Sequence, residues 1–542
     1  MSATVFLSLN PGWAAPKRVP DAPHLYILEK AAQIRVSPEL VPDAAEEFLI
    51  EVDPAMVAAN PPAFLLDLPG FPPLEAVRTR FVTYRPDWKS WFGTLRDART
   101  GGEATGFIHI GYHGDQITAV IEHEGERYRI VGGVEESQRL VRLSGELSPP
   151  PCGLENTTDL MEPSLFREDR HSEGSRVLVK SATKAAGLKT TARIDVLAVY
   201  PKAFYTLSAT VESGLFTFIQ DSISLANNAF LNSGVDAFYN LVGIVPVLDV
   251  QPATGIFASL DWLNTEPSEV TALRNAFGAD VVTVYVPFDW SSPNFCGVAN
   301  LPQTGGGYRS GSGNYASFGQ KAFTANRSGC GLNDFTLTHE IGHNYGMRHD
   351  DDSNDALDLF GYGRGHTLTV SGVLKATIMG CACGSSPKPA CGSDISNAVC
   401  GRIPHFSDPN ILYQGVATGV APAGTDPGRN NALVGRNQVG TYSGYRTQSS
   451  NTPPTAKFSV SCCGRLCSFD ASSSTDNVAL PTTAANYKWD FGDGTTATGK
   501  NAGRLFAADG TYRLHLVVYD SGGQSDVIWQ AVSVQGNCTT PP

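Results

Sequence analysis

The chain has 542 residues, of which 42% are hydrophobic and 17% charged, so it can bury several cores and is not of the disordered type. Its formal net charge of −13 argues against nucleic acid as a partner, because phosphate binding needs a basic surface. The sequence has no run of 18 apolar residues, which predicts that no helix spans a membrane.

The cysteines predict disulfide bonds and an oxidising compartment, because they fall in even-numbered groups in the centre and near the C-terminus. Residues 1–15 make a poor signal peptide, since they lack a basic start and their apolar run is short. We nevertheless expect a secreted protein whose leader is truncated in this sequence. The 11 cysteines are Cys152, Cys296, Cys330, Cys381, Cys383, Cys391, Cys400, Cys462, Cys463, Cys467 and Cys538.

Residues 1–154 are predicted to form a β-rich domain. Short segments rich in Ile, Val, Tyr and Phe are separated by turn residues, a pattern typical of a β-meander. His109, His113 and His123 have strand spacing, so we expect ordinary surface or cross-strand residues. The predicted strands are 106–112, 116–122 and 126–131.

Residues 155–192 are polar and mixed in charge, which predicts an exposed linker. In residues 193–446 buried strands alternate with amphipathic helices, which predicts a mixed sheet with helices packed on it. The glycine-rich stretch 305–313 lacks the ending of a phosphate-binding loop, so we expect a flexible loop. The predicted strands are 194–200, 241–248 and 281–286, and the predicted helices are 211–233 and one that starts near Pro267 and ends before Gly278.

The stretch Thr338–Asp350, THEIGHNYGMRHD, contains a metal-ligand pattern. His339 and His343 are four residues apart, so a helix, with Asn333 or Asp334 as its N-cap, places both imidazoles on one face. Glu340 then lies beside the metal as a general base for water that the metal activates.

Gly346 and His349 extend this pattern to H-E-x-x-H-x-x-G-x-x-H. Gly346 can end the helix in the left-handed conformation, and His349 can return as a third nitrogen ligand. Three protein ligands and one open position are typical of catalytic zinc. A shorter H-E-x-x-H can occur by accident in a long helix, but the two added positions make chance a poor explanation.

This motif resembles that of the metzincin zinc metalloproteases, and Asp350 after the third His resembles the adamalysin (reprolysin) branch. The resemblance implies that Met379, in Thr377–Gly380, forms the Met-turn beneath the metal. It also implies a twisted sheet above the motif helix, with Gly297–Leu301 as the edge that pairs with substrate. By the same resemblance, Pro404–Pro409 forms the wall of the S1′ specificity pocket.

In metzincin zymogens a propeptide cysteine followed by Gly blocks the metal, and Cys152-Gly153 follows three prolines in the same way. Cys152 is therefore a candidate cysteine switch, with a disulfide partner or a buried free thiol as alternatives. The resemblance makes residues 1–154 a propeptide and 155–192 the place of maturation cleavage. Asp350-Asp351-Asp352 is a candidate Ca²⁺ site, with a solvated loop as the alternative.

Residues 447–454 read as a linker, and residues 455–536 resemble a PKD module, an immunoglobulin-like β-sandwich. The matching motif is Trp489–Gly494, with a long strand from Thr511 to Tyr519. Its four cysteines suggest two disulfides. The resemblance implies a partner that is an extracellular protein or polysaccharide.

The sequence therefore predicts a multidomain protein: a β-rich prodomain, an α/β (α+β) metzincin-like catalytic domain and a PKD sandwich. We expect a secreted zinc endopeptidase, made as a zymogen, that cleaves protein substrates. An adhesin or carbohydrate-binding protein with a vestigial metal site is the alternative, although a decayed protease would usually lose Glu340. A zinc hydrolase acting on a non-peptide substrate is a third hypothesis.

Overall fold

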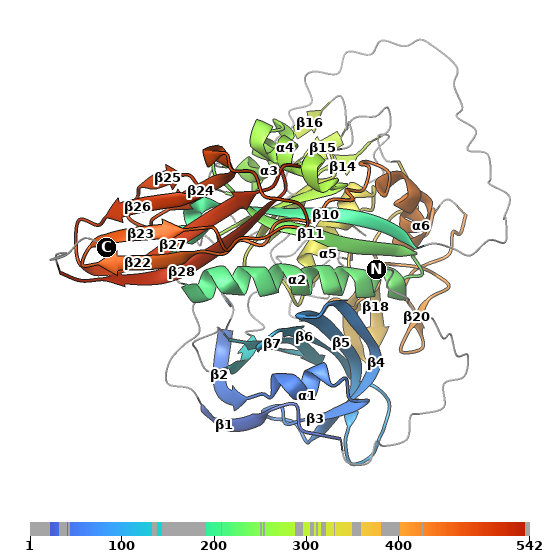
Figure 1. The fold of residues 1–542 in the computed structure, drawn as a ribbon. Helices are drawn as coiled ribbons and strands as arrows, with labels where there is room; N and C mark the ends of the chain where they lie inside the picture. The colour runs from blue at the N-terminus through green and yellow to red at the C-terminus, as the bar shows by residue number, and fades with distance from the viewer. Residues whose placement is uncertain are drawn as a thin grey trace, which may run out of the picture.

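Three β-structures are arranged around one long helix, α2 (Ala209–Asn232), in the computed structural model (Figure 1). A nine-stranded sheet lies on one side of α2, and a five-stranded sheet lies on the other. A C-terminal β-sandwich contacts the N-terminal end of α2. The described residues are 22–31, 41, 44–132, 138–143, 191–207, 209–249, 252, 255–287, 296–303, 308–310, 313–315, 321–329, 331–349, 359–380, 401–424 and 426–536.

The N-terminal sheet is antiparallel and has the order β1-β2-β9-β8-β7-β6-β5-β4-β3. The predicted meander is confirmed, because its three segments are β6, β7 and β8. The one helix described in this region is the short α1 (Pro54–Ala58), capped by Asp53. The strands are β1 (Ile27–Ala31), β2 (Ala44–Glu51), β3 (Ala63–Leu66), β4 (Leu74–Arg85), β5 (Trp88–Asp97), β6 (Gly106–His113), β7 (Gln116–His123), β8 (Glu126–Val131) and β9 (Arg139–Leu143).

The central sheet is mixed, as predicted, with the order β11-β10-β12-β17-β13. Its first four strands are parallel, and β13 pairs antiparallel with β17 at the edge. The strands are β10 (Ala192–Pro201), β11 (Ala237–Val247), β12 (Val281–Val286), β13 (Gly297–Ala299) and β17 (Phe323–Arg327). The helices are α2, α3 (Ile256–Asn264), α4 (Ser268–Phe277), α5 (Thr336–Asn344) and α6 (Asn431–Tyr442), with a 3-10 helix, η2 (Lys202–Thr206).

Small strand pairs complete this part of the chain. The stretch predicted as a flexible loop contributes two strands of a small antiparallel sheet, so that prediction was wrong for its described residues. Helix α3 was not predicted, although Ile256, Leu260 and Leu263 have helical spacing and are buried on one face. The small sheets are β14 (Leu301–Pro302) with β15 (Tyr308–Ser310) and β16 (Gly313–Tyr315), β18 (Thr367–Val370) with β19 (Val373–Ala376), and β20 (Leu412–Tyr413) with β21 (Val416–Ala417).

The nine-stranded sheet shares a hydrophobic core with α2 and α5. Trp88, Phe92 and Phe107 from the sheet belong to the same buried cluster as Phe218 of α2 and Ile341 of α5. Burial of apolar area contributes about 25 cal/mol per Å², so this common core attaches the N-terminal sheet firmly. The opposite face of the central sheet packs against α3 and α4 in a second cluster.

Polar contacts from one hairpin, β7–β8, add to this attachment. Lys375 Nζ of β19 donates to Glu122 Oε1 of β7 in a buried ion pair. Arg127 Nη1 of β8 lies 3.2 Å from each carboxylate oxygen of Asp334, just before α5. The hairpin therefore contacts both a strand and the helix start that position the candidate site.

The three N-terminal histidines lie on the paired strands β6 and β7, in agreement with the cross-strand alternative, but their side chains are buried rather than at the surface. His109 is 0% and His123 3% exposed. The His113 side chain lies against α2, where its Nε2 is 3.0 Å from Asp221 Oδ1. Burial lowers the pKa of His109 to about 4. Sequence spacing could not reveal this, because the burial comes from a helix about 100 residues downstream.

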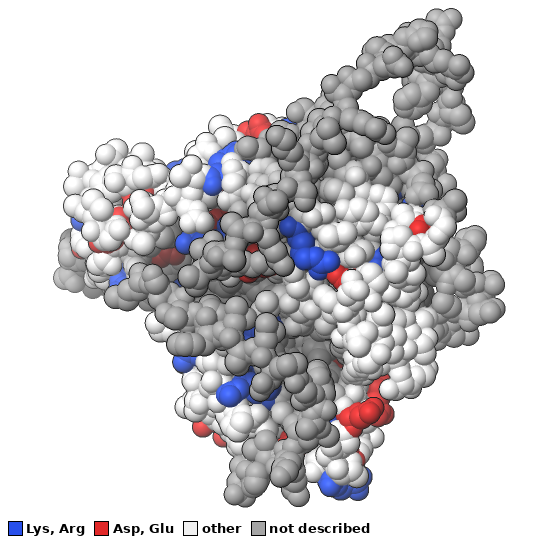
Figure 2. All heavy atoms as spheres, turned by 90° about the vertical axis from the view of Figure 1, so that its right-hand side faces the viewer, with Lys and Arg blue, Asp and Glu red and all other residues white. Residues whose placement is uncertain are grey.

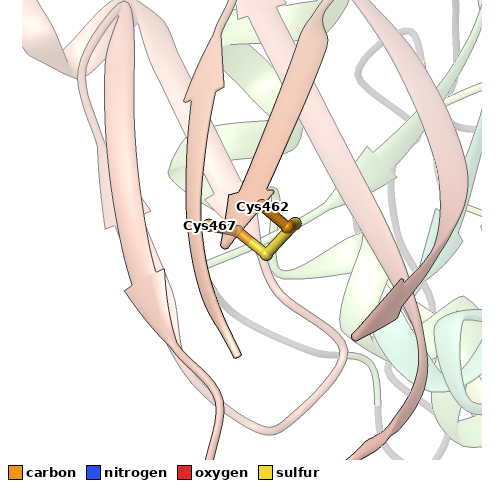
Figure 3. Close-up of a disulfide and its surroundings, with 2 residues drawn as sticks. All are labelled: Cys462 and Cys467. Atoms are coloured by element: carbon orange, nitrogen blue, oxygen red, sulfur yellow. A yellow bond between two sulfur atoms is a disulfide. The ribbon is translucent and has the colours of Figure 1, made fainter. Parts of the chain in front are cut away.

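The C-terminal region is the predicted β-sandwich, with Trp489 buried at its centre. Cys462 and Cys467 form a disulfide across β22 and β23 (Figure 3). Cys463 is disulfide-bonded as well. One sheet contains β22 (Ser459–Cys463), β23 (Leu466–Asp470) and β26 (Asn501–Leu505), and the other contains β25 (Thr496–Thr498), β24 (Tyr487–Asp490), β27 (Gly510–Tyr519) and β28 (Ser525–Val534), with a 3-10 turn at Ala484–Asn486.

The sandwich docks on the first turn of α2. His515 Nε2 of β27 lies 2.9 Å from Glu212 Oε2, and both side chains are buried. The His515 ring also stacks on Tyr205 of η2, with centroids 3.5 Å apart.

On the face shown in Figure 2, the described charged side chains are scattered among uncharged residues. None of the described helices is long and apolar enough for a bilayer.

Candidate active site

Helix α5 carries the motif and is only nine residues long. It starts after Phe335, which has a positive φ of 58° and provides no side-chain cap. The expectation that Asn333 or Asp334 caps the helix was therefore wrong. The Asp334 carboxylate instead binds Arg127, a partner from a distant part of the chain.

The helix ends as its glycine predicted. Gly346 has a φ of +89°, in the left-handed region that favours glycine. Its N–H donates to His343 O at 2.8 Å, and the Met347 N–H donates to Gly342 O at 3.0 Å. These two bonds are those of a Schellman motif, which reverses the chain direction. The reversal brings His349 back beside the helix.

The three predicted ligands converge in a buried cluster. His339, His343 and His349 are 1%, 0% and 3% exposed. The Nε2 atom of His339 lies 3.0 Å from that of His349 and 3.1 Å from that of His343. Their ligand atoms form the group within the described residues that could hold a metal ion.

Hydrogen bonds at the other ring nitrogens determine which atoms face this centre. His339 Nδ1 lies 2.7 Å from Ile378 O, and His343 Nδ1 lies 3.0 Å from Met347 O. A carbonyl only accepts, so each Nδ1 carries the proton and each Nε2 presents a lone pair. Neutral His339 and His343 in this tautomer cannot hydrogen-bond to each other through Nε2, whereas a cation between them satisfies both lone pairs. The donor set therefore fits a metal ion.

Electrostatics favour the neutral form that a ligand needs. Burial is the largest cause that lowers the pKa of His339 far below its ordinary value. The positive charge of Arg402 lowers this pKa further, followed by His343 and His349. His339 is therefore deprotonated at Nε2 at neutral pH, ready to coordinate a metal.

The predicted Met-turn lies under the helix. Gly380 N–H donates to Thr377 O at 2.8 Å, which closes the turn. Met379 is fully buried, and a Cβ added at Gly342 would lie 2.7 Å from its Sδ. The preceding residue, Ile378, provides the carbonyl that accepts from His339. The turn therefore supports α5 from below and orients one of the three imidazoles.

Glu340 is buried and lies against the sheet edge. It is 1% exposed, and a Cβ added at Gly297 of β13 would lie only 2.4 Å from its Oε1. Within the predicted segment Gly297–Leu301, Gly297–Ala299 forms β13, the last strand of the central sheet, and its pairing with substrate stays a prediction. The glycine lets this edge approach the carboxylate closely.

With Glu340 in its predicted role as general base, replacing Gly297 with Ala should lower kcat/KM for the predicted peptide hydrolysis by about 100-fold, because a shift of about 1 Å at such a group has an effect of this size. The added methyl must displace either Glu340 or β13. Metal content should stay unchanged, which elemental analysis checks. Gly440→Ala is the matched control, since nothing lies within 4 Å of a Cβ there. Full activity in Gly297→Ala would contradict this account of how Glu340 is positioned.

Several predicted site residues lie outside the described residues. They are the candidate switch Cys152, the candidate calcium ligands Asp350, Asp351 and Asp352, and the cysteines between residues 381 and 400. Conversely, Arg402 lies near enough to His339 to lower its pKa, and Lys375 holds Glu122 two residues before the Met-turn, and the sequence contained no signal for either. Their positions depend on strand pairings made only in the folded chain.

Residues 190–407 match the family model for metallo-peptidase family M12, of the reprolysin type, and residues 451–534 match the model for the PKD domain. The chain contains a reprolysin-like metallopeptidase domain. It is therefore a hydrolase that acts on peptide bonds, and its family membership implies a bound metal. Both predicted resemblances are confirmed.

This metallopeptidase is similar to curated proteins along most of its length. It is 24% identical over 399 residues to a peptidyl-Asp metalloendopeptidase of Xanthomonas campestris pv. campestris, covering 70% of this chain and 82% of that protein. A protein of the same name from Stenotrophomonas maltophilia is 24% identical over 361 residues, covering 64% and 76%. The PKD1 domain of a Vibrio cholerae metalloprotease is 28% identical over 16% of this chain and 99% of that structure, with a TM-score of 0.14.

Proposed function

We propose that this metallopeptidase is a secreted zinc endopeptidase, made as a zymogen, that uses Glu340 as its general base. The observation that carries the proposal is the convergence of three buried imidazole Nε2 atoms, with Glu340 buried next to His339 in the same helix. A structural metal site would have a fourth protein ligand, whereas the described group contributes three.

Each residue then has a defined role. His339, His343 and His349 hold the ion, and the Ile378 and Met347 carbonyls keep two of these rings in the ligating tautomer. When bound, zinc would polarise the scissile carbonyl and make the attacking water more acidic. Glu340 accepts the proton of that water and passes it to the leaving amine. Met379 is a hydrophobic floor, and the edge strand β13 pairs with the extended substrate backbone.

We further propose that the substrates are peptides cleaved next to an Asp residue. The names of the similar Xanthomonas and Stenotrophomonas proteins support this assignment. A carboxylate side chain needs a cationic partner in the substrate cleft, because an unpaired charge is costly to desolvate. An arginine or lysine side chain beside the site is therefore the expected partner of the substrate carboxylate.

The proposed domains are a propeptide (1–154), a linker cut during maturation (155–192), the catalytic domain (193–446) and a PKD domain (455–536). The contacts of the β7–β8 hairpin with Lys375 and Asp334 support a role of the N-terminal sheet in holding the site region before cleavage. Cys152 stays the candidate for blocking the metal. The Cys462–Cys467 disulfide supports an oxidising, extracellular location, where the PKD domain would bind a protein or polysaccharide.

A protease assay on the full chain tests this function. We expect casein cleavage that a chelator abolishes and added Zn²⁺ restores, since the ion is held by three side chains. Mass spectrometry should find a mature N-terminus between residues 155 and 192. If refolded, zinc-loaded protein shows no cleavage that depends on metal, the endopeptidase proposal is wrong. Binding to polysaccharide or matrix protein without cleavage would favour the adhesin alternative instead.

A further inference from the structure

Arg402 is a buried guanidinium without a carboxylate partner among the described residues. It is 9% exposed, and its Nη1 donates to the main-chain oxygen of Asp334 at 3.0 Å. Its Nε is buried and has no hydrogen-bond partner in the described part of the chain. A buried cation held by a single neutral acceptor is energetically unfavourable, so an anion is expected to complete its surroundings.

The main chain places Arg402 beside the metal ligands. It pairs with Ala376 in a parallel bridge, in which Ile403 N–H donates to Ala376 O at 2.8 Å. Two residues after Ala376, Ile378 provides the carbonyl that accepts from His339. The positive charge of Arg402 accordingly lowers the pKa of the His339 imidazole, and it is the largest cause after burial.

The carboxylate of Asp334 does not neutralise Arg402 in this arrangement. Both of its oxygens lie 3.2 Å from Arg127 Nη1 of the N-terminal sheet, and only its main-chain oxygen accepts from Arg402. The remaining donors of Arg402 therefore make no hydrogen bond or ion pair with a carboxylate of the described residues. A planar guanidinium with unused donors is well suited to a carboxylate, which it can bind through two parallel hydrogen bonds.

We propose that Arg402 determines substrate specificity by binding the side-chain carboxylate of an Asp residue that flanks the cleaved bond. The inference rests on the proposed endopeptidase function and assigns its acidic preference to one residue. An Asn side chain has nearly the same shape but carries no charge, so its binding would leave the guanidinium buried and unpaired. A site of this kind discriminates strongly between the two side chains.

The experiment compares matched peptides that contain Asp or Asn at each position around the cleaved bond. The full chain is used after its self-processing has reached a constant pattern. We expect the wild type to prefer Asp over Asn by about 100-fold in kcat/KM, and Arg402→Gln to reduce that ratio to near one. Cleavage of the Asn peptide should change little in the variant. Arg429→Gln, at a half-exposed surface pair with Asp426, is the control with an unchanged ratio.

Two further variants separate specificity from structure. Asp334→Asn removes the carboxylate that Arg127 holds in the uncleaved chain but keeps the main-chain oxygen that Arg402 uses, so it should retain the Asp preference after processing. Arg402→Lys keeps the charge but loses the planar fork, so its preference should fall by about 10-fold. In the Glu340→Gln background, dissociation constants for both peptides should show the same dependence on Arg402 without turnover.

The outcomes are distinguishable. A wild type that cleaves casein without preferring Asp overturns the inference and leaves the endopeptidase function standing. If the protein cleaves no peptide at all, both the inference and the proposed endopeptidase function are wrong. Equal loss of Asp and Asn cleavage in Arg402→Gln, or an unchanged ratio in Arg402→Lys, shows a structural role and also overturns the inference.

Discussion

Glu340→Gln is expected to lower kcat for peptide hydrolysis by about 10³- to 10⁴-fold, the range typical of a lost general base. The amide has the same shape as the carboxylate, so it fits the narrow space beside Gly297. It cannot accept a proton from the attacking water at neutral pH. The three imidazoles are untouched, and zinc should therefore stay bound.

Stopped assays with a fluorogenic peptide measure this loss, and elemental analysis measures the retained metal. Glu266→Gln is the control, because this half-exposed residue pairs with Lys321 away from the histidines. The substrate Kd should stay within a few-fold of that of the wild type. Normal turnover by the Gln variant would show that another group takes the proton.

His349→Ala should weaken zinc binding by about 100-fold or more and abolish hydrolysis at ordinary zinc concentrations. Zinc bound by four ligands gains about 10 to 16 kcal/mol, so one ligand accounts for several kcal/mol. His349 lies after the Schellman turn rather than in α5, so its loss should leave the helix intact. The effect should therefore appear in metal affinity before it appears in folding.

Competition with a chromophoric chelator gives the affinity, and circular dichroism checks the fold. His24→Ala is the matched control, since this imidazole is half exposed and pairs with Asp67. Adding excess zinc should restore part of the metal content but little of the activity. A variant that binds zinc as tightly as the wild type would show that His349 is not a ligand.

The convergence of the three histidines could be predicted from the sequence because its determinants are local. The three histidines, Glu340 and the helix-ending glycine all lie within 11 residues, where helix geometry alone relates His339 to His343. The same is true of the meander over residues 106–131, whose turns and alternating strands are short-range features. The Met-turn required a resemblance, since nothing local relates Met379 to the imidazoles.

The surroundings of the centre could not be predicted in this way. Asp334 was expected to cap α5, but it binds Arg127, more than 200 residues earlier. His113 was expected as a surface or cross-strand residue, and α2 covers it. In both cases burial and ion pairing with a distant segment stabilise the fold by more than the local preference, which contributes about 1 kcal/mol.

The amino-acid sequence by itself determined the chemistry: which side chains can hold an ion, which one can move a proton, and where the helix that carries them ends. Only the tertiary structure decided which segments surround these side chains. It brought Gly297 onto Glu340, the β7–β8 hairpin onto Lys375 and Asp334, and Arg402 beside His339. The physical reason is distance along the chain, because ligand spacing is encoded within a few helical turns, whereas a cleft is formed by segments that meet only when their common core is buried.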